Sequence, residues 1–180
     1  MRLQFNQMKN YFQIVLLLLL CTSLKAQDKN VFDIARKGTL SEIEGIYKQN
    51  PELVNAINDN KATPLILACY RNNEAVALYL SDKVSNINYN SGMGTALMAA
   101  IMSGNKVIIE KLISKKADLD QQDIQGKTAL IYAAFNNNFE VAQLLVKAGA
   151  NSKLADNEKR TALDYAKFNK NTQLIILLDK

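Results

Sequence analysis

Histidine and tryptophan are absent from this chain of 180 residues, and cysteine and proline occur only twice each. Without histidine, a Ser-His-Asp triad, a Cys-His pair and a zinc site with histidine ligands are all excluded. Two cysteines, Cys21 and Cys69, are too few for a four-cysteine zinc site, an iron–sulfur cluster or a disulfide-rich scaffold. Two prolines and seven glycines also argue against a loop-rich all-β fold. These absences favour a helical protein that binds another molecule over an enzyme.

The composition that is present suits one ordinary folded domain. Hydrophobic residues make up 48% of the chain and charged residues 22%, which is too apolar for a disordered protein.

The N-terminal segment, residues 1–26, has the features of a secretory signal peptide. Basic residues come first, an apolar run covers residues 11–20, and a short polar stretch ends at Ala26, as in a segment cleaved during export. The apolar run is too short for a membrane span, which needs about 20 residues. We therefore expect a periplasmic or secreted mature protein, residues 27–180, without a membrane span.

Cys21 leaves a second interpretation open, in which the protein is a lipoprotein anchored at this cysteine. The residue before it is Leu20, whereas lipoprotein motifs have a small residue there. The signal peptide is therefore the favoured interpretation.

Removal of the signal peptide also changes the charge of the protein. Of the 22 basic side chains, three lie in residues 1–26, which leaves 19 against 17 acidic ones and a net charge of +2. Nucleic-acid binding needs a concentrated basic face, and this small excess does not indicate one. We expect no nucleic acid as a partner.

The rest of the chain repeats one sequence pattern at a regular interval. Four segments begin with a threonine, continue with a small residue or proline and then a leucine, and end in alanine; they cover residues 63–68, 95–100, 128–133 and 161–166. Their threonines recur at intervals of about 33 positions, within the range of repeat proteins that stack. Each segment is followed by a polar break with asparagine and then by a second apolar run with the spacing of an amphipathic helix.

Each unit predicts two helices. The threonine can cap the first helix by accepting a hydrogen bond from a free backbone N–H, and Pro64 suits the first helical position. The second helix turns its apolar side back against the first. One helix pair cannot bury its own apolar surface, so the units must stack.

These segments and their spacing resemble the ankyrin repeat family, whose opening Thr-Pro-Leu-His-x-Ala they match apart from the histidine. The resemblance implies an all-α solenoid of about five repeats with short β-hairpin fingers between them. The implied repeats are approximately 29–57, a degenerate capping repeat, then 58–89, 90–122, 123–155 and 156–180.

The chain departs from the family pattern in two places. Ile66, Met98, Ile131 and Asp164 stand where the family has histidine. The glycine that usually ends the second helix in a left-handed conformation is kept as Gly149, whereas Lys83 and Lys116 stand near the other two places. A side chain in this conformation costs roughly 1 kcal/mol, so we expect these two junctions to be less stable.

The chemistry-bearing residues have structural interpretations. Residues 118–123 contain three aspartates, but a calcium-binding EF-hand loop needs glycine and glutamate where Asp123 and Ala129 stand. Cys69 is expected to be a buried apolar residue rather than a reactive thiol. The acid pairs Glu42 with Glu44 and Asp156 with Glu158 are expected on solvated surfaces. The sequence therefore predicts no catalytic residue, metal or cofactor.

The resemblance implies a non-catalytic protein–protein interaction module that binds through a concave groove and the finger tips. The helix residues expected in the groove follow each threonine by seven positions: Tyr70, Met102, Phe135 and Phe168. The finger residues expected beside them are Asp59, Asn60, Ser91, Met93, Ile124, Gln125, Asn157 and Glu158. In the alternative interpretation, the four helix residues pack onto the next repeat instead.

The expected partner of this monomer is another protein. Similar exported bacterial ankyrin proteins accompany catalases in oxidative-stress defence or neutralise a toxin, so analogy suggests a catalase-like stress enzyme or a toxin as the partner. A structural or self-assembling repeat array is an alternative function, and a carboxylate-based hydrolase is a more remote one.

Overall fold

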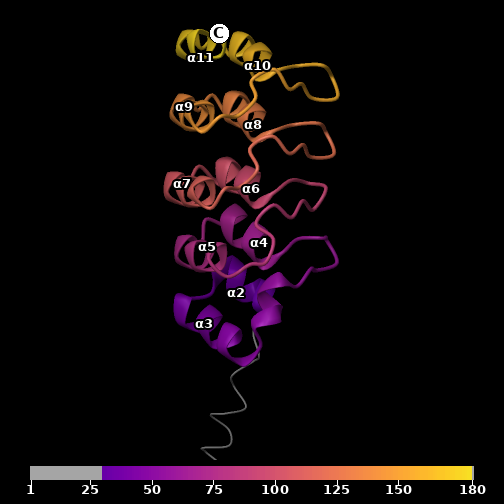
Figure 1. Ribbon diagram of the computed structural model, residues 1–180, viewed down its shortest axis with the longest axis vertical. Coiled ribbons are helices and arrows are strands. Elements are labelled where there is room, and N and C mark those ends of the chain that lie inside the picture. The colour runs from indigo at the N-terminus through magenta and orange to yellow at the C-terminus, as the bar shows by residue number, and fades with distance from the viewer. Residues whose placement is uncertain (1–29, 180) are drawn as a thin grey trace, which may run out of the picture. The chain divides into compact units, whose positions relative to one another are not determined.

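The computed structural model describes residues 30–179, and a compact unit begins at Val31 (Figure 1). The predicted signal peptide, residues 1–26, lies outside the described residues. Within residues 30–179 the structure contains ten α-helices, one 3-10 helix and no β-strand.

Five helix pairs follow one another along the unit, one pair for each predicted repeat. The pairs are α2 (Val31–Lys37) with α3 (Leu40–Gln49), α4 (Pro64–Tyr70) with α5 (Glu74–Ser81), α6 (Ala96–Ser103) with α7 (Lys106–Ser114), α8 (Ala129–Phe135) with α9 (Phe139–Lys147), and α10 (Ala162–Phe168) with α11 (Thr172–Leu178). The 3-10 helix η1 (Pro51–Asn55) follows α3.

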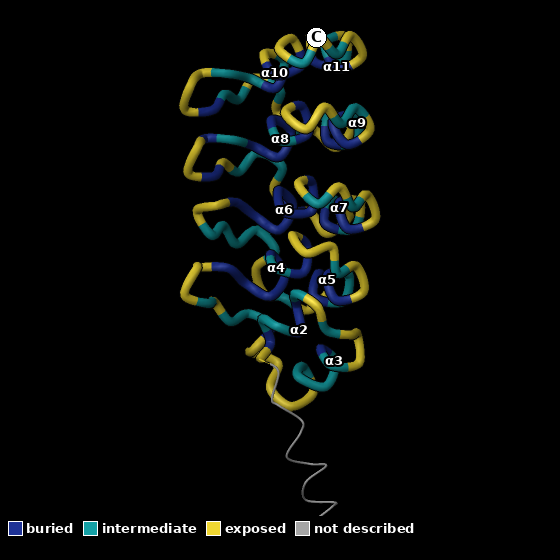
Figure 2. Tube along the Cα trace, turned by 180° about the vertical axis from the view of Figure 1, so that it is seen from behind, coloured by how far each residue is buried: buried dark blue, intermediate teal, exposed yellow. Residues whose placement is uncertain are grey.

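The helix pairs form two parallel columns. In Figure 1 the first helices α4, α6, α8 and α10 make one column, and the second helices make the other. Long loops project from the first column on the side away from the second (Figure 1). We call these loops the fingers: residues 58–62, 90–94, 123–127 and 156–160. Their tips are exposed, while the helix columns are buried where they meet (Figure 2).

Threonine begins each of the first helices in repeats two to five, as the sequence predicts. Its hydroxyl oxygen accepts a hydrogen bond from the backbone N–H three residues later, at 3.3–3.4 Å in all four repeats. Pro64 occupies the first position of α4, where the missing N–H removes no helical hydrogen bond.

Asparagine both turns the chain and begins the second helices. The side chains of Asn105, Asn138 and Asn171 each accept a hydrogen bond at 3.0 Å from the N–H three residues later. Asn73 has no such capping bond. Its amide instead donates to three carbonyl groups of the capping repeat, the shortest bond being 2.9 Å to Gly38, and so ties repeat two to repeat one.

The core lies between the helix pairs. The leucine two positions after the threonine is at most 2% exposed in repeats two, three and four, where it is Leu65, Leu97 and Leu130. Cys69 is fully buried, which agrees with the expected apolar role.

The fifth repeat has polar residues where the inner repeats have buried ones. Three and six positions after the threonine, the inner repeats bury Ile66, Met98, Ile131, Cys69, Ile101 and Ala134. In the fifth repeat these positions are Asp164 and Lys167, and both are exposed. A polar outer surface is typical of the terminal repeat of a stacked array.

The fingers implied by the resemblance are present, and within residues 30–179 they are tight turns without β-strands. Among the described residues, β-pairing is limited to one isolated bridge between Ala155 and Thr161. Each finger is instead a tight turn; in the fourth repeat, for example, the N–H of Asp123 donates to the carbonyl of Lys127 at 3.1 Å. Five residues close one such turn but leave no room for a ladder of strand pairs.

Lys116 adopts the left-handed conformation on which the expected loss of stability rests, whereas for Lys83 that expectation is wrong. Lys116 has φ 63° and Gly149 has φ 98°, but Lys83 has no positive φ. After α7 and α9 a backbone N–H donates to the carbonyl five residues earlier, as Ala117 does to Leu112. This hydrogen bond requires a residue in the left-handed conformation just before the donor. After α5 the N–H of Val84 reaches back only four residues, to Leu80, so this junction carries no such strain.

Candidate functional site

The four predicted groove residues end the first helices and are all exposed. The exposed fractions of Tyr70, Met102, Phe135 and Phe168 are 53, 49, 52 and 84%. Each is the last or next-to-last residue of its helix. We call these four residues the apolar stripe.

A cation from a finger shows that the stripe and the fingers share one surface. Lys127 belongs to the finger of the fourth repeat, and its ammonium lies 5.0 Å from the centre of the Phe135 ring. The other stripe residues hold the equivalent positions at the ends of their own first helices. We call the apolar stripe together with the four fingers the inner surface.

Lys127 lies among three aromatic rings. Its ammonium is 5.7 Å from the centre of the Tyr132 ring and 6.0 Å from that of Tyr165, in addition to Phe135. Phe135 also meets Tyr165 edge to face, with ring centres 5.7 Å apart. Phe135 therefore packs on the next repeat, as the alternative interpretation holds, while half of its side chain stays exposed.

A buried carboxylate holds each of the last two fingers to its helix. Asp123 accepts a 2.6 Å hydrogen bond from the Tyr132 hydroxyl, and Asp156 accepts one of the same length from the Tyr165 hydroxyl. The other oxygen of Asp156 accepts from the backbone N–H groups of residues 158 and 160. These bonds fix the finger and the ring beside it in one arrangement.

The same contacts shift the pKa values of the pair in the fifth repeat. Burial alone would raise the pKa of Asp156, but the bonds from the Tyr165 hydroxyl and from two backbone N–H groups lower it below its usual range. Burial and the Asp156 carboxylate raise the pKa of Tyr165 to about 12. The charged aspartate and the neutral tyrosine are thus the stable forms.

The tips of the last three fingers are joined by main-chain hydrogen bonds. The N–H of Ile124 donates to Gly92 at 2.8 Å, and the N–H of Asn157 donates to Gln125 at 2.9 Å. All the predicted finger residues are exposed except Ser91, whose hydroxyl donates to the Gly94 carbonyl. A depression of about 230 Å³ lies at the last two fingers, lined by Ile124, Gln125, Lys127, Asp156, Asn157 and Glu158.

Comparison with known families agrees with the stacked helix pairs and the fingers. A family model described as ankyrin repeats (three copies) matches residues 7–123 and 107–180. The chain belongs to the ankyrin repeat family. Ankyrin repeats indicate a protein–protein interaction module.

Two curated ankyrin relatives match part of the chain. The protein named Ankyrin repeat and SAM domain-containing protein 6 is 30% identical over 101 residues in Rattus norvegicus and 29% identical over 101 residues in Mus musculus. Each match covers 55% of this chain and 11% of the relative. The chain thus matches about a tenth of the length of these relatives, and the similarity supports the repeat itself.

The aspartates of residues 118–123 hold the ankyrin loops together. Asp118 accepts from the N–H of Asp120, and Asp120 accepts from the N–H of Asn151 in the next repeat, both at 2.9 Å. In residues 30–179 no group of three metal-ligating side chains is present, and no helix is long and apolar enough to cross a membrane.

Three of the four acids in these pairs have partners in this ankyrin chain. Glu42 caps α3 through Thr39. Asp156 is buried at the base of its finger rather than on the solvated surface that was expected, and Glu158 pairs with Arg160 at 2.8 Å. Burial raises the pKa of the Cys69 thiol, which disfavours the reactive thiolate.

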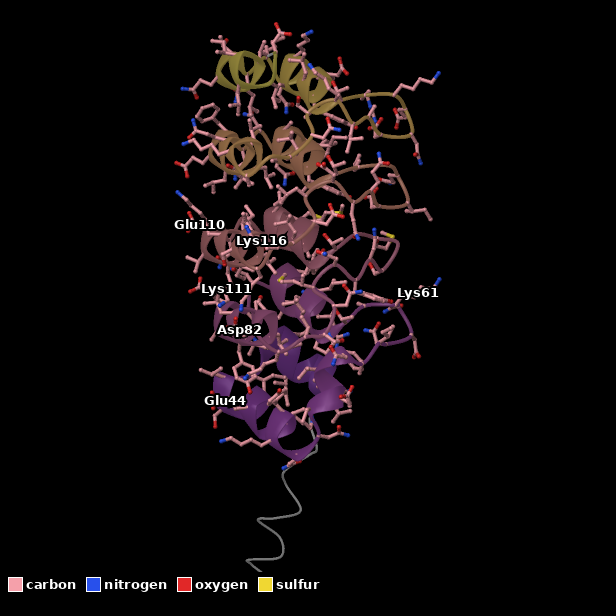
Figure 3. The ribbon with its side chains drawn as sticks, viewed as in Figure 1. Glu44, Lys61, Asp82, Glu110, Lys111 and Lys116 are labelled. Atoms are coloured by element: carbon pink, nitrogen blue, oxygen red, sulfur yellow. The ribbon has the colours of Figure 1, made fainter. Side chains whose placement is uncertain are left out.

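The outer side of the ankyrin stack has a different chemistry. Asp82, just after α5, pairs with Lys111 of α7 at 2.8 Å (Figure 3). It also pairs at 2.5 Å with Lys115, which follows the last residue of α7. Lys106 pairs with Glu140 of α9 at 3.6 Å. These charges join neighbouring repeats to one another.

The carboxylate–tyrosine pairs and the position of Lys127 were not predicted from the sequence. A signal was present, because both tyrosines follow their aspartates by nine residues and the two pairs hold equivalent positions in successive repeats. Both residue types are common in turns and helices, so the pairing becomes visible only when the repeats are aligned.

Proposed function

We propose that this ankyrin repeat protein is an exported, periplasmic module that binds a partner protein through its inner surface and catalyses no reaction. The observation that carries the proposal is the contact of Lys127 with Phe135. It brings half-exposed apolar side chains and polar ones onto one surface, which is the arrangement of binding hot spots and their polar surroundings.

The apolar stripe is large enough to anchor an interface. An aromatic side chain can bury about 150–250 Å². About half of Tyr70, Met102 and Phe135 is already covered, and Phe168 is 84% exposed. The four stripe residues therefore supply about half of the roughly 800 Å² that each partner buries in a stable complex. The exposed finger tips would supply the polar rim.

The proposed export rests on the predicted signal peptide of residues 1–26. The partners to test first are the two classes that analogy suggests, a catalase-like stress enzyme and a toxin. Mass spectrometry of the mature protein checks the export: we expect an N-terminus at or within a few residues of Gln27. A lipid-modified Cys21 would instead place the protein on a membrane.

Two observations favour binding by a monomer over the alternative functions. The charged residues Asp164 and Lys167 stand where a further repeat would need apolar contacts, which opposes end-to-end assembly. Asp156 uses both carboxylate oxygens in hydrogen bonds, so it is poorly suited to act as the base of a hydrolase.

The test is partner capture with a variant that removes the middle of the stripe. Immobilised wild-type protein and a Met102→Ala, Phe135→Ala double variant are exposed to periplasmic extract, and the melting temperature of each is measured. We expect the double variant to lose the captured partner while it melts close to the wild type. Ile176→Ala is the matched control, because Ile176 is an exposed apolar side chain on the second helix α11.

The control variant should retain the partner. If the double variant still captures the partner, or if its melting temperature falls steeply, the stripe is part of the core and the proposal is wrong.

A further inference from the structure

We propose that the partner presents an amphipathic α-helix to the apolar stripe, with apolar side chains seven residues apart and acidic side chains beside them. This inference rests on the proposed function, because it names the chemistry of the partner at the same inner surface.

The spacing of the stripe matches that of a helix. Successive stripe residues occupy equivalent positions on packed helices, whose axes lie about 8–10 Å apart. In an α-helix, residues seven positions apart lie on nearly the same side and about 10.5 Å apart. In a β-strand, side chains of one face recur about every 6.6 Å, so a strand would match the stripe only at every second repeat.

The chemistry of the stripe also favours a helix. Met102, Phe135 and Phe168 have no hydrogen-bond donor on their side chains. The nearby hydroxyls of Tyr132 and Tyr165 already donate to aspartates. A polyproline segment has a suitable period, about 9.3 Å for three residues, but its carbonyl groups need donors. A helix satisfies its own backbone and needs only apolar contacts.

Two cations that lie over rings of the stripe indicate acidic flanks on this helix. The Arg71 guanidinium lies 5.9 Å from the Tyr70 ring centre, and Lys127 lies 5.0 Å from that of Phe135. Among residues 30–179, no carboxylate lies within ion-pair distance of either cation. Arg160, by contrast, pairs with Asp156 and Glu158. A carboxylate of the partner would therefore complete the pairs of Arg71 and Lys127.

The test selects partners from a display library of random peptides, each about 24 residues long and so able to form more than six helical turns. The library is panned on the full chain and counter-selected on the Met102→Ala, Phe135→Ala double variant. We expect the enriched peptides to carry apolar residues at positions i, i+7 and i+14, to be acidic overall, and to gain helical circular dichroism at 222 nm on binding.

Single variants then test which residues hold the selected peptide, with affinity measured by fluorescence anisotropy. Phe135→Ala should weaken binding at least about tenfold, as loss of a hot-spot ring does. Lys127→Gln should weaken it about three- to tenfold, and the loss should shrink at high salt. Ile176→Ala should leave the affinity unchanged.

Enrichment of proline-rich sequences, of alternating apolar residues or of no common spacing would overturn the inference, as would equal binding by the double variant. Capture of the natural partner is measured separately. If the double variant loses the natural partner while the library shows no helical spacing, the proposed function stands and the helical partner is rejected.

Discussion

Repeats two and three differ from repeats four and five at three aligned positions, of which two lie in the finger and one in the first helix. In the first pair these positions hold neutral residues, namely Asn58 and Asn90, Ala62 and Gly94, and Leu67 and Ala99. In the second pair they hold Asp123 and Asp156, Lys127 and Arg160, and Tyr132 and Tyr165. At these three positions the first half of the inner surface is neutral, whereas the second half carries charged and aromatic side chains.

The difference separates what the turn requires from what the surface adds. Asn58 accepts hydrogen bonds from the N–H groups two and four residues later, and Asp123 accepts the equivalent pair. One side-chain oxygen is therefore enough to form the finger. The second oxygen of the carboxylate is left for the Tyr132 hydroxyl, which links the finger to its helix.

Leu130→Ala would break the array between the two halves and should have the largest effect. Leu130 is 1% exposed, so the cavity should cost about 2–5 kcal/mol of unfolding free energy. Because contacts in a repeat array are between neighbours, the urea transition should become broader or split in two.

Leu163→Ala is the matched control for this variant. Leu163 holds the same position in the fifth repeat and is only half-buried. The variant should therefore lose less unfolding free energy than Leu130→Ala, and its urea transition should stay single. A sharp, unshifted transition for Leu130→Ala would contradict the repeat register.

Tyr165→Phe tests the link that only the second half has. Removal of the hydroxyl takes a hydrogen bond from the buried Asp156 carboxylate, which should cost about 1.5–3 kcal/mol. Urea denaturation measures the loss, and Tyr132→Phe should behave in the same way. Tyr70→Phe alters an exposed side chain of the first half and should stay within about 0.5 kcal/mol of the wild type.

Acid should loosen the finger of the fifth repeat, residues 156–160, before that of the second repeat, residues 58–62. The pKa of Asp156 is lowered in the folded protein, so its stabilisation is present above the unfolded pKa of about 3.9 and is lost as the pH falls through the lower folded value. In the finger of the second repeat the equivalent residue is Asn58, which does not titrate. Amide exchange at residues 158 and 160 should therefore accelerate at low pH relative to residues 60 and 62, after correction for intrinsic rates.

Asp156→Asn should abolish this difference between the fingers. Equal acid sensitivity of the two fingers in the wild-type protein would show that the carboxylate does not hold the turn.

Lys61→Gly should produce the smallest effect, a gain of about 0.5–1 kcal/mol. Lys61 has φ 58°, a left-handed conformation that suits glycine. The equivalent residue in the finger of the fourth repeat is already Gly126. Gly126→Ala should do the opposite, because its new methyl group would lie 2.6 Å from the Asn157 side-chain oxygen. Thermal unfolding measures the change in stability of both variants. A loss of stability in Lys61→Gly would show that the left-handed conformation of Lys61 carries no strain.

The fold followed from the sequence where it depends on local signals that recur. The four threonines set the first helices, and their spacing set the register that buries Leu130. The error at Lys83 arose because the left-handed residue depends on how far back the helix-ending N–H reaches, which residue type alone does not determine. The fingers implied by the ankyrin resemblance are also present, as tight turns rather than as paired strands.

The site was predicted less completely than the fold. The exposure of the apolar stripe follows from its position in the register. The placement of Lys127 over Phe135 depends instead on the return of a finger to a helix end eight residues later in the chain. The Tyr165 bond likewise spans finger and helix, so neither contact follows from residue types alone.

Hydrogen exchange of the protein with and without its captured partner tests the central claim most directly. The account predicts that the partner slows exchange in the fingers and at the ends of α6 and α8, with the strongest protection in residues 123–127, and leaves α5, α7 and α9 unchanged. Protection confined to the second helices, with the fingers unaffected, would contradict it.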